Sequence, residues 1–147
     1  MSEELQVRCP QTDEEWQQYY HLRWSVLRQP WGEPEGSERD EQDGETEHCA
    51  VVADGRVIGV GRLQMNSHEE AQIRYMAVAP DCHGRGLGRR VVEFLEEKAR
   101  ELGAARLVLD ARQNAVGFYL ILGYNVTADS YLLFGKIQHY RMQKDLY

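Results

Sequence analysis

Three glycines at alternate positions, Gly84, Gly86 and Gly88, stand immediately before an amphipathic pattern, and this stretch constrains the fold more than any other. Apolar residues then recur at steps of four, four, four and three, at Leu87, Val91, Leu95, Ala99 and Leu102. The spacing predicts one helical face, with Gly103 as the C-terminal stop. Because a helix start exposes unpaired backbone N–H groups and glycine lets a ligand approach them, the stretch predicts an anion site, with phosphate as its natural ligand.

The glycine spacing excludes the two commonest phosphate motifs. A Walker A loop requires G-x-x-x-x-G-K-[ST], and the dinucleotide fingerprint requires G-x-G-x-x-G close behind a strand. This chain has G-x-G-x-G instead, and Pro80 with the residues after it separates the glycines from the preceding strand. Arg85, Arg89 and Arg90 add local positive charge to a chain whose formal net charge is −7. The ligand expected at this turn is therefore a multiply charged phosphate compound.

The remaining apolar periodicity predicts a mixture of strands and helices. An S/T-x-x-E capping box at 12–15 opens a helix that ends at Pro30, and Asp54-Gly55 between two apolar runs predicts a type I′ hairpin. Strands are expected at 5–7, 49–53, 56–64, 72–79 and 106–111, with another that starts at 124–126 and a last one at 139–144. Further helices are expected at 87–102 and 114–123. Helices separate these strands only in part, which predicts a mixed α+β or α/β sheet and not a regular doubly wound one.

The strand at 72–79 is important because it leads into the glycine turn. Its alternation places Ile73, Tyr75 and Ala77 on one face of the sheet and Met76 and Val78 on the other. Pro80 is expected to close the strand.

Length, charge and cysteine usage exclude several classes of protein. A chain of 147 residues predicts a single domain, and its negative net charge argues against a nucleic-acid binder. Cys9, Cys49 and Cys82 are far apart and form no C-x-x-C pair, so neither a metal site nor a disulfide framework is expected. The first residues lack a signal-peptide pattern and no apolar run approaches 18 residues, so we expect no membrane partner and a cytoplasmic location.

Two motifs resemble those of the GNAT acetyltransferase superfamily. The run from His83 to Gly88, after Val78-Ala79-Pro80, is similar to motif A, usually Q/R-x-x-G-x-G/A, with His83 in place of the first Gln or Arg. The run from Asn114 to Tyr124 is similar to motif B, N-x-x-A-x-x-F/L-Y-x-x-L-G-F/Y, whose asparagine falls at Arg112. The segment 57–63 is similar to the strand that precedes motif A, so the resemblance covers residues 48–126 well.

The resemblance implies a single acyl-CoA N-acyltransferase domain over residues 1–147. The implied fold is a mixed twisted sheet of six or seven strands with three or four flanking helices, splayed between the fourth strand, 72–79, and the fifth, 106–111. The implied reaction uses acetyl-CoA, without a metal, and moves the acetyl group to a primary amine of a small molecule or peptide by direct attack in a ternary complex. Dimers are common in this superfamily, so a homodimer is a further expected option. A non-catalytic acyl-CoA-binding module for sensing or interaction is the alternative, favoured by Gln72 where the family often has a glutamate.

The resemblance also implies roles for individual residues. The pyrophosphate is expected on the backbone amides from Arg85 to Arg89, and the pantetheine arm along the main chain of Met76 and Val78. The Val78 N–H is the expected oxyanion donor and the Tyr119 hydroxyl the expected general acid. The implied catalytic residues are thus Tyr119 and Val78, and the implied cofactor-binding residues are Met76, Ala77, Val78, His83, Gly84, Arg85, Gly86, Leu87, Gly88, Arg89, Asn114 and Tyr119.

The general base and the acceptor amine stay open at this point. Glu70, His48, His139 and water are the alternatives for the base. The segment 33–47 carries eight acidic residues and lies where family members build the acceptor wall. It either favours a cationic amine or is a solvated loop with one helical turn. Three aromatic residues either line an acceptor pocket or fill the core, namely Trp24, Trp31 and Tyr131.

Overall fold

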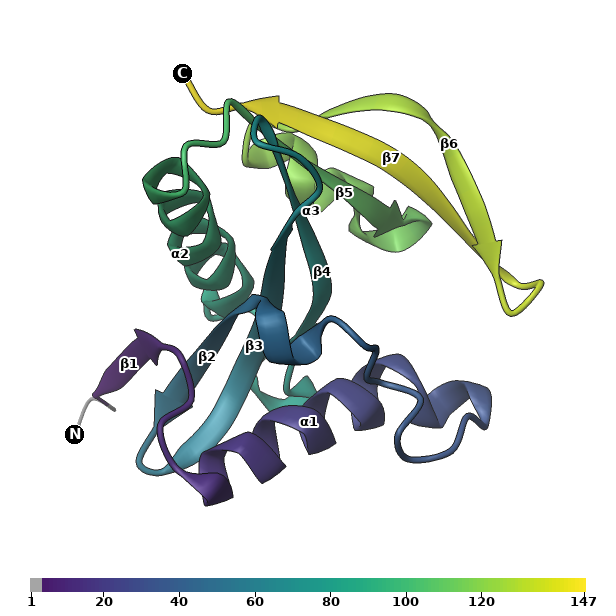
Figure 1. The fold of residues 1–147 in the computed structure, drawn as a ribbon. Helices are drawn as coiled ribbons and strands as arrows, with labels where there is room; N and C mark the ends of the chain where they lie inside the picture. The colour runs from purple at the N-terminus through teal and green to yellow at the C-terminus, as the bar shows by residue number, and fades with distance from the viewer. Residues whose placement is uncertain (1–3) are drawn as a thin grey trace.

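The computed structural model describes residues 4–147 and contains one seven-stranded mixed sheet with helices on both faces (Figure 1). The strands are β1 (Leu5–Arg8), β2 (Glu47–Ala53), β3 (Arg56–Met65), β4 (Glu70–Val78), β5 (Arg106–Arg112), β6 (Asn125–Leu133) and β7 (Ile137–Asp145). The helices are α1 (Asp13–Leu27), α2 (Leu87–Glu101) and α3 (Val116–Ile121), with 3-10 turns at Gln29–Trp31, Asp43–Glu45, Pro80–Cys82 and Gln113–Ala115. The strand order is β1-β2-β3-β4-β5-β7-β6, and the mixed-sheet fold class is confirmed.

Helix α1 begins at the predicted capping box. The Thr12 Oγ1 accepts the Glu15 N–H at 3.1 Å, while the Glu15 carboxylate accepts the N–H of Gln11 at 2.9 Å in place of the Thr12 amide that the box predicts. The helix ends at Leu27, and Pro30 lies in the 3-10 turn that follows. The end of α1 therefore comes three residues before the proline that was expected to stop it.

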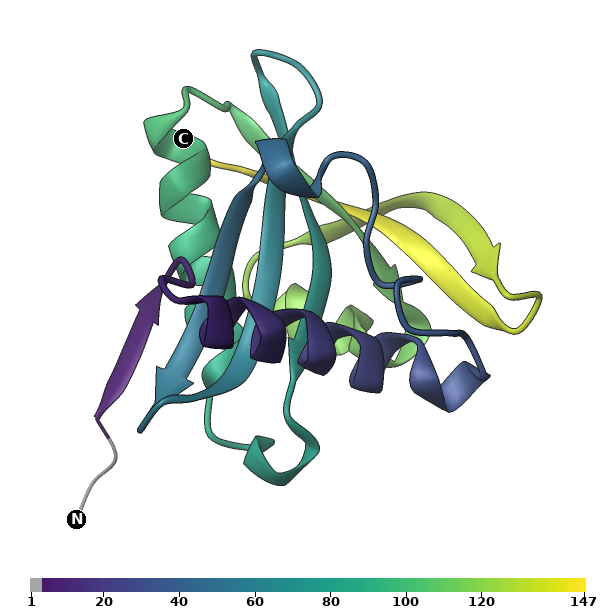
Figure 2. The same cartoon turned by 60° about the horizontal axis from the view of Figure 1, so that its bottom comes forward.

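The first four strands form an antiparallel half-sheet between α1 and α2 (Figure 2). Asp54 and Gly55 have φ angles of 49° and 78°, the left-handed values that a type I′ turn requires, so the predicted hairpin is confirmed. Gly61 on β3 lets α2 approach the sheet closely, because a Cβ there would lie 2.6 Å from Val91 Cγ1. This close packing fixes the position of the α2 N-terminus relative to β4.

Strand β4 carries a β-bulge that redirects its second half. Between Arg74 and Ala77, two residues of β4 lie opposite one residue of β3, and Tyr75 within the bulge has a φ of 58°. The extra residue reverses the alternation, so Ile73 and Ala77 lie on opposite faces. The expectation that Ile73 shares a face with Tyr75 and Ala77 is therefore wrong for Ile73.

Strands β4 and β5 separate after a short parallel pairing. Their register runs from Glu70 opposite Arg106 only as far as Ile73 opposite Leu109, and beyond this point β5 pairs with β7 alone. The two strands diverge toward their C-terminal ends, next to the start of α2 (Figure 1). The predicted splay between the fourth and fifth strands is confirmed, and in open α/β sheets such a crevice is where ligands bind.

Candidate active site

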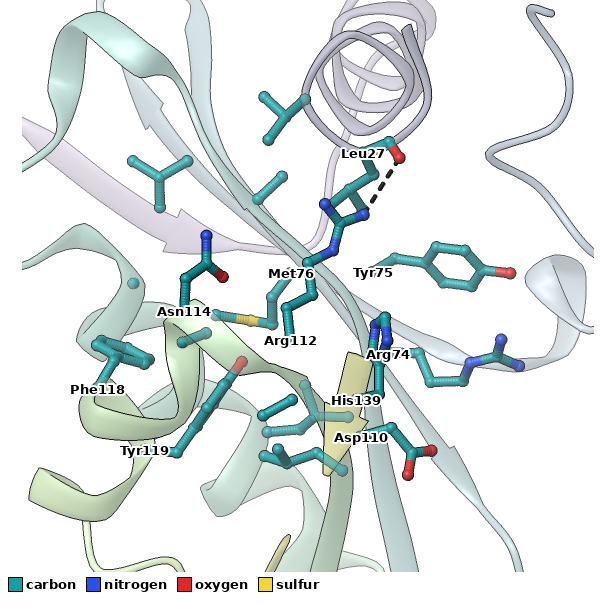
Figure 3. Close-up of a pocket in the computed structure, with 18 of the residues that line it drawn as sticks. Leu27, Arg74, Tyr75, Met76, Asp110, Arg112, Asn114, Phe118, Tyr119 and His139 are labelled. Atoms are coloured by element: carbon teal, nitrogen blue, oxygen red, sulfur yellow. Dashed lines mark hydrogen bonds between the residues drawn. The ribbon is translucent and has the colours of Figure 1, made fainter. Parts of the chain in front are cut away.

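A cavity of about 580 Å³ occupies the opening between β4 and β5 (Figure 3). Its walls come from β4 from Gln72 onward, the end of β5, the end of α1, the start of α2, α3 and the β6–β7 hairpin. Arg85 and Arg89 are the two expected cofactor residues that do not line it. The other ten do line it, namely Met76, Ala77, Val78, His83, Gly84, Gly86, Leu87, Gly88, Asn114 and Tyr119.

The start of α2 forms an uncapped helix N-terminus in the cavity wall. Gly86 is the N-cap residue with a φ of 74°, and no side chain of the described residues 4–147 caps the first amides of the helix. Gly84 has a φ of 80°, so both positions use a conformation that glycine adopts without strain. A Cβ at either glycine would meet nothing within 4 Å, which leaves the backbone open. The amides of residues 87–89 are therefore donors without an intrahelical acceptor.

The two arginines expected near the phosphate point elsewhere. Arg85 borders a separate small depression with Asp81 and Cys82, and its Nη1 lies 3.7 Å from the Cys82 Sγ. The Arg89 Nε donates to the Glu93 carboxylate at 2.7 Å on the surface of α2. The main chain of the glycine turn, and not these guanidinium groups, borders the cavity.

The main chain of Val78 faces the cavity. The Ala79 N–H donates to the Ile58 carbonyl of β3 at 2.9 Å, and successive amides of a strand point to opposite sides, so the Val78 N–H points toward β5. Pairing of β4 with β5 has already ended at Ile73, which leaves this N–H beside the opening. The His83 Nε2 donates to the Val78 carbonyl at 3.1 Å. The residue that departs from motif A therefore ties the glycine turn back to the end of β4.

Tyr119 places a buried hydroxyl at the cavity. Its ring packs edge-on against Phe118 and Tyr124, with centroid distances of 4.9 Å and 5.7 Å, and 6% of its surface is exposed, against 37% for Phe118. The hydroxyl points into the cavity beside Met76 and Asn114 (Figure 3). No hydrogen bond from the described residues 4–147 reaches it. Burial raises the pKa of this hydroxyl, so it stays protonated at neutral pH.

Two of the three candidate bases lie away from the cavity. The Asn66 Nδ2 and the Arg106 Nε donate to the carboxylate of Glu70 at 2.9 Å and 3.1 Å, and these bonds lower its pKa. His48 is buried, with its Nε2 2.7 Å from the Asp43 carbonyl, and burial lowers its pKa. Neither residue lines the cavity, because Glu70 stands at the start of β4 and His48 lies in β2.

His139, the third candidate, lies in the cavity wall on β7, directly opposite Arg112 of β5. Its ring stacks on Tyr131 with a centroid distance of 4.3 Å and an interplanar angle of 14°. The Nδ1 lies 3.0 Å from the Ile137 carbonyl, which can only accept, so Nδ1 carries the proton and Nε2 has the lone pair of the neutral ring. Burial, with a contribution from Arg112, lowers the pKa of His139 below its usual 6.5. The site thus contains a neutral imidazole with a basic nitrogen.

Charged residues near His139 were missed by the sequence motifs. Asp110 lies two residues before Arg112 on β5, and Arg28 comes from the end of α1. The Ser130 Oγ donates to the Asp110 carboxylate at 2.7 Å. The pairing of β5 with β7 brings Asp110 to the strand of His139, and the end of α1 supplies Arg28, and no local pattern in the sequence specifies either contact.

The three aromatic candidates for the acceptor pocket have different positions. Tyr131 lines the cavity. The Trp24 Nε1 donates to the Glu33 carbonyl at 2.9 Å, and Trp31 lies near Phe134 with a centroid distance of 6.5 Å. Neither tryptophan lines the cavity.

The acidic segment 33–47 is not solvated throughout. It contains the expected helical turn, but an Asp43 carboxylate oxygen lies 2.8 Å from Arg23 and 3.2 Å from Arg62. An Asp40 carboxylate oxygen lies 2.6 Å from Arg62, and both arginines are fully buried. These two carboxylates neutralise buried guanidinium groups of α1 and β3. The expectation of a plain solvated loop is therefore wrong, and Asp40 and Asp43 do not form a free anionic wall for a cationic amine.

Within residues 4–147, no group of three or more His, Cys, Asp or Glu side chains is placed to hold a metal ion. No helix in this part of the chain is long and apolar enough to cross a membrane. Cys9 is exposed and Cys49 and Cys82 are buried, all three as free thiols.

Comparison with known proteins gives consistent matches. A model of the Acetyltransferase (GNAT) family matches residues 16–124, a range that includes both motifs. A protein of Bacillus subtilis (strain 168) described as "Uncharacterized N-acetyltransferase YjcF" is 29% identical over 133 residues, covering 90% of this chain and 94% of that protein. The crystal structure of an acyl-CoA N-acyltransferase from Pseudomonas aeruginosa has a TM-score of 0.80 at 23% identity, covering 97% of this chain and 99% of the other. An aminoglycoside 6'-N-acetyltransferase complexed with coenzyme A has a TM-score of 0.80 at 15% identity, covering 98% and 97%. Because the family match spans most of the chain, this protein belongs to the GNAT acetyltransferase family.

Proposed function

We propose that this protein is an N-acetyltransferase that moves the acetyl group of acetyl-CoA to a primary amine by direct attack in a ternary complex. The observation that carries the proposal is the cavity between β4 and β5, because it combines an uncapped helix N-terminus with a buried proton donor and a neutral imidazole. Membership of the GNAT family and the coenzyme A complex of the aminoglycoside enzyme with the same fold support acetyl-CoA as the co-substrate.

The residues present fit acetyl-CoA. The start of α2 offers the amides of residues 87–89 to a pyrophosphate, and Gly84 and Gly86 keep side chains away from them. Where β4 diverges from β5, the main chain of Met76 and Val78 is available to the pantetheine arm. When bound, acetyl-CoA supplies a thioester that a neutral amine can attack.

Two groups of the protein serve the charges that develop during transfer. The Val78 N–H, directed toward β5, is the proposed donor to the oxygen that gains negative charge. Tyr119 is the proposed general acid for the departing sulfur. Its raised pKa keeps it protonated, and its hydroxyl has no acceptor within residues 4–147 that would compete for the proton.

His139 is the proposed general base. Its lowered pKa keeps the ring neutral at pH 7, and the Ile137 carbonyl fixes the tautomer that leaves Nε2 basic. Glu70 and His48 are not proposed, because their polar atoms are engaged outside the cavity. Water is the remaining alternative, and an unchanged rate in His139→Gln would assign the proton transfer to it.

The proposal is tested by release of free CoA thiol from acetyl-CoA with a panel of primary amines. We expect turnover with at least one amine and, in Tyr119→Phe, a loss of about 10²- to 10⁴-fold, the usual contribution of a positioned acid. A non-catalytic acyl-CoA-binding module, favoured by Gln72, predicts instead that acetyl-CoA raises the melting temperature while no amine releases thiol. If neither thiol release nor a melting-temperature shift is observed, both functions are wrong.

A further inference from the structure

Two arginines in the cavity wall have no carboxylate partner among the described residues. Arg28 follows α1 and Arg112 ends β5, and both line the cavity at the end that contains His139. Within residues 4–147, neither guanidinium forms an ion pair with an aspartate or glutamate, whereas the buried Arg23 pairs with Asp43 and the buried Arg62 with both Asp40 and Asp43. The positive charges of Arg28 and Arg112 are therefore not neutralised by the described part of the chain.

Backbone carbonyls provide the hydrogen bonds that orient these two side chains. The Arg112 Nη2 donates to the Leu27 carbonyl at 3.2 Å (Figure 3), and the Arg28 Nη1 donates to the same carbonyl at 3.3 Å. The Arg28 Nε donates to the Ser37 carbonyl at 3.1 Å, and its guanidinium lies 5.7 Å from the centroid of Phe134. Because a guanidinium has five N–H donors, most donors of both side chains have no acceptor within residues 4–147.

The other charged side chains of the wall do not compensate the pair. Arg74 lies 3.5 Å from Asp40, and Asp110 lies 3.1 Å from Arg141. Asp40 is shared between Arg74 and the buried Arg62, and Asp110 is paired with Arg141, so neither pair leaves a surplus negative charge in the wall. The net charge of this end of the cavity is positive, although the chain as a whole carries a formal charge of −7.

A purely structural role explains only part of this arrangement. Cations are favourable near the C-terminus of a helix, and both arginines reach the Leu27 carbonyl at the end of α1. Burial lowers the pKa of Arg112, and the neighbouring charge of Arg28 lowers it further. One cation is enough to cap the end of α1, and a second one beside it adds electrostatic repulsion, so capping alone does not explain the pair. An anion bound between them would remove the repulsion and use the remaining donors.

We propose that Arg28 and Arg112 bind an anionic group of the acceptor, so that the amine acetylated by this protein belongs to a small molecule that also carries a carboxylate or a phosphate. The inference rests on the proposed acetyl transfer and adds the acceptor class. Planar guanidinium groups match the paired oxygens of either anion. His139 lies opposite Arg112 in the β5–β7 pair, so an anchored anion keeps the amine near the proposed base. A polyamine would meet the same two positive charges and be repelled.

The first test compares acceptors that differ only in the anionic group. The panel contains the free amino acids and their amides, phosphoethanolamine and ethanolamine, and putrescine as the cation. We expect kcat/KM for the anionic member of the productive pair to exceed that of its neutral partner by about 10- to 100-fold, the range of charge-assisted hydrogen bonds. The carboxylate and phosphate arms identify which anion is used.

Variants separate recognition of the anion from support of α1. Arg28→Gln and Arg112→Gln should raise KM for the anionic acceptor by about 10-fold or more relative to KM for the neutral acceptor in the same variant. Arg112→Lys should recover part of this loss. Arg100→Gln is the matched control, because the Arg100 Nε also donates to a backbone carbonyl, that of Leu146, at 3.4 Å but lies outside the cavity wall. If Arg112→Gln lowers the melting temperature but leaves KM for the anionic acceptor unchanged, Arg112 only caps α1 and the inference is overturned.

A second test does not depend on turnover. Calorimetric titrations with butyrate and with inorganic phosphate should show weaker binding in Arg112→Gln and unchanged binding in Arg100→Gln. CoA is present in these titrations to occupy its proposed phosphate site at the amides of residues 87–89. Equal affinity in wild type and Arg112→Gln overturns the inference. Fast acetylation of neutral or cationic amines that is insensitive to Arg112→Gln also overturns it, while the proposed acetyl transfer stands. If no amine releases thiol, the proposed function is wrong, and the titration alone decides whether the anion site exists.

Discussion

Tyr119 and Tyr124 are two buried tyrosines, and we expect the hydroxyl of the first to serve turnover and that of the second to serve stability. The Tyr119 hydroxyl lies at the cavity without a hydrogen bond from residues 4–147, whereas the Tyr124 hydroxyl donates to the Glu96 carboxylate at 2.8 Å outside the cavity wall. The exposed fractions of the two residues are 6% and 1%. Phenylalanine at either position removes one oxygen and keeps the packed ring, so the two substitutions form a matched comparison.

Tyr119→Phe is expected to lower turnover without lowering stability. Loss of a positioned general acid slows a reaction by about 10²- to 10⁴-fold. The free energy of unfolding should stay the same or rise slightly, because burying a hydroxyl without a partner is unfavourable and the variant removes that hydroxyl.

Tyr124→Phe is expected to do the reverse. A hydrogen bond to a charged group contributes about 1.5–3 kcal/mol. Lys144 still lies 3.0 Å from the Glu96 carboxylate, so the carboxylate keeps a partner and we expect the lower part of that range. A loss of about 2 kcal/mol lowers the melting temperature by roughly 4–8 °C in a domain of this size. The kcat of the folded variant should equal that of the wild type.

Two assays on the same preparations decide the comparison. Urea unfolding followed by circular dichroism gives the free energies, and CoA thiol release gives kcat. The reasoning is refuted if Tyr119→Phe loses stability as Tyr124→Phe does while its kcat is unchanged. Tyr119 would then be a core aromatic whose hydroxyl has no part in proton transfer.

Three further substitutions, two of them with a matched control variant, test the proposed base, the acidic segment and the start of α2. The ratio of wild-type kcat/KM to that of His139→Gln should fall toward one as the pH drops through a midpoint below 6.5, because protonation of the low-pKa ring removes the base. Asp43→Asn should lower the free energy of unfolding by about 3–5 kcal/mol by leaving two buried arginines short of a counter-charge, whereas the exposed Glu35→Gln should change it by less than about 0.5 kcal/mol. Gly86→Val should abolish the acetyl-CoA-induced rise in melting temperature, while Gly103→Val, at a similar positive φ beyond the other end of α2, should keep it.

Each of these has a contrary outcome. A kcat/KM ratio that is constant between pH 5 and pH 8 would remove His139 as the base. Equal unfolding free energies for Asp43→Asn and Glu35→Gln would mean that the acidic segment is solvated after all. If Gly86→Val and Gly103→Val both lose the acetyl-CoA-induced shift, the loss in Gly86→Val comes from strain in α2 and not from blocked amides.

Much of the fold was predictable because local patterns specify it. The Asp54-Gly55 turn, the apolar steps of α2 and its Gly103 stop are each encoded by residues close in sequence. The bulge in β4 was not predictable, because period-two alternation does not reveal an inserted residue. Tyr75 is held at its positive φ within tertiary contacts, with its hydroxyl 3.3 Å from Asp40 and its ring 4.3 Å from the Arg23 guanidinium.

Sequence motifs specified the site only at the end that we propose binds acetyl-CoA. The glycine turn and Tyr119 lie within two contiguous motifs, so their place beside the cavity follows from the resemblance. Arg28, Arg112 and His139 belong to three elements that meet through the β5–β7 register and the end of α1. Composition was also misleading for the acidic segment 33–47, because it does not reveal which arginines the carboxylates neutralise.

A crystal structure of the protein with bound CoA would show whether the start of α2 holds the diphosphate. We expect diphosphate oxygens within hydrogen-bond distance of the amides of residues 87–89. We also expect the pantetheine arm beside the main chain of Met76 and Val78, and the sulfur at the Tyr119 hydroxyl. CoA bound away from the cleft between β4 and β5, with those amides in contact with solvent or protein, would contradict these expectations.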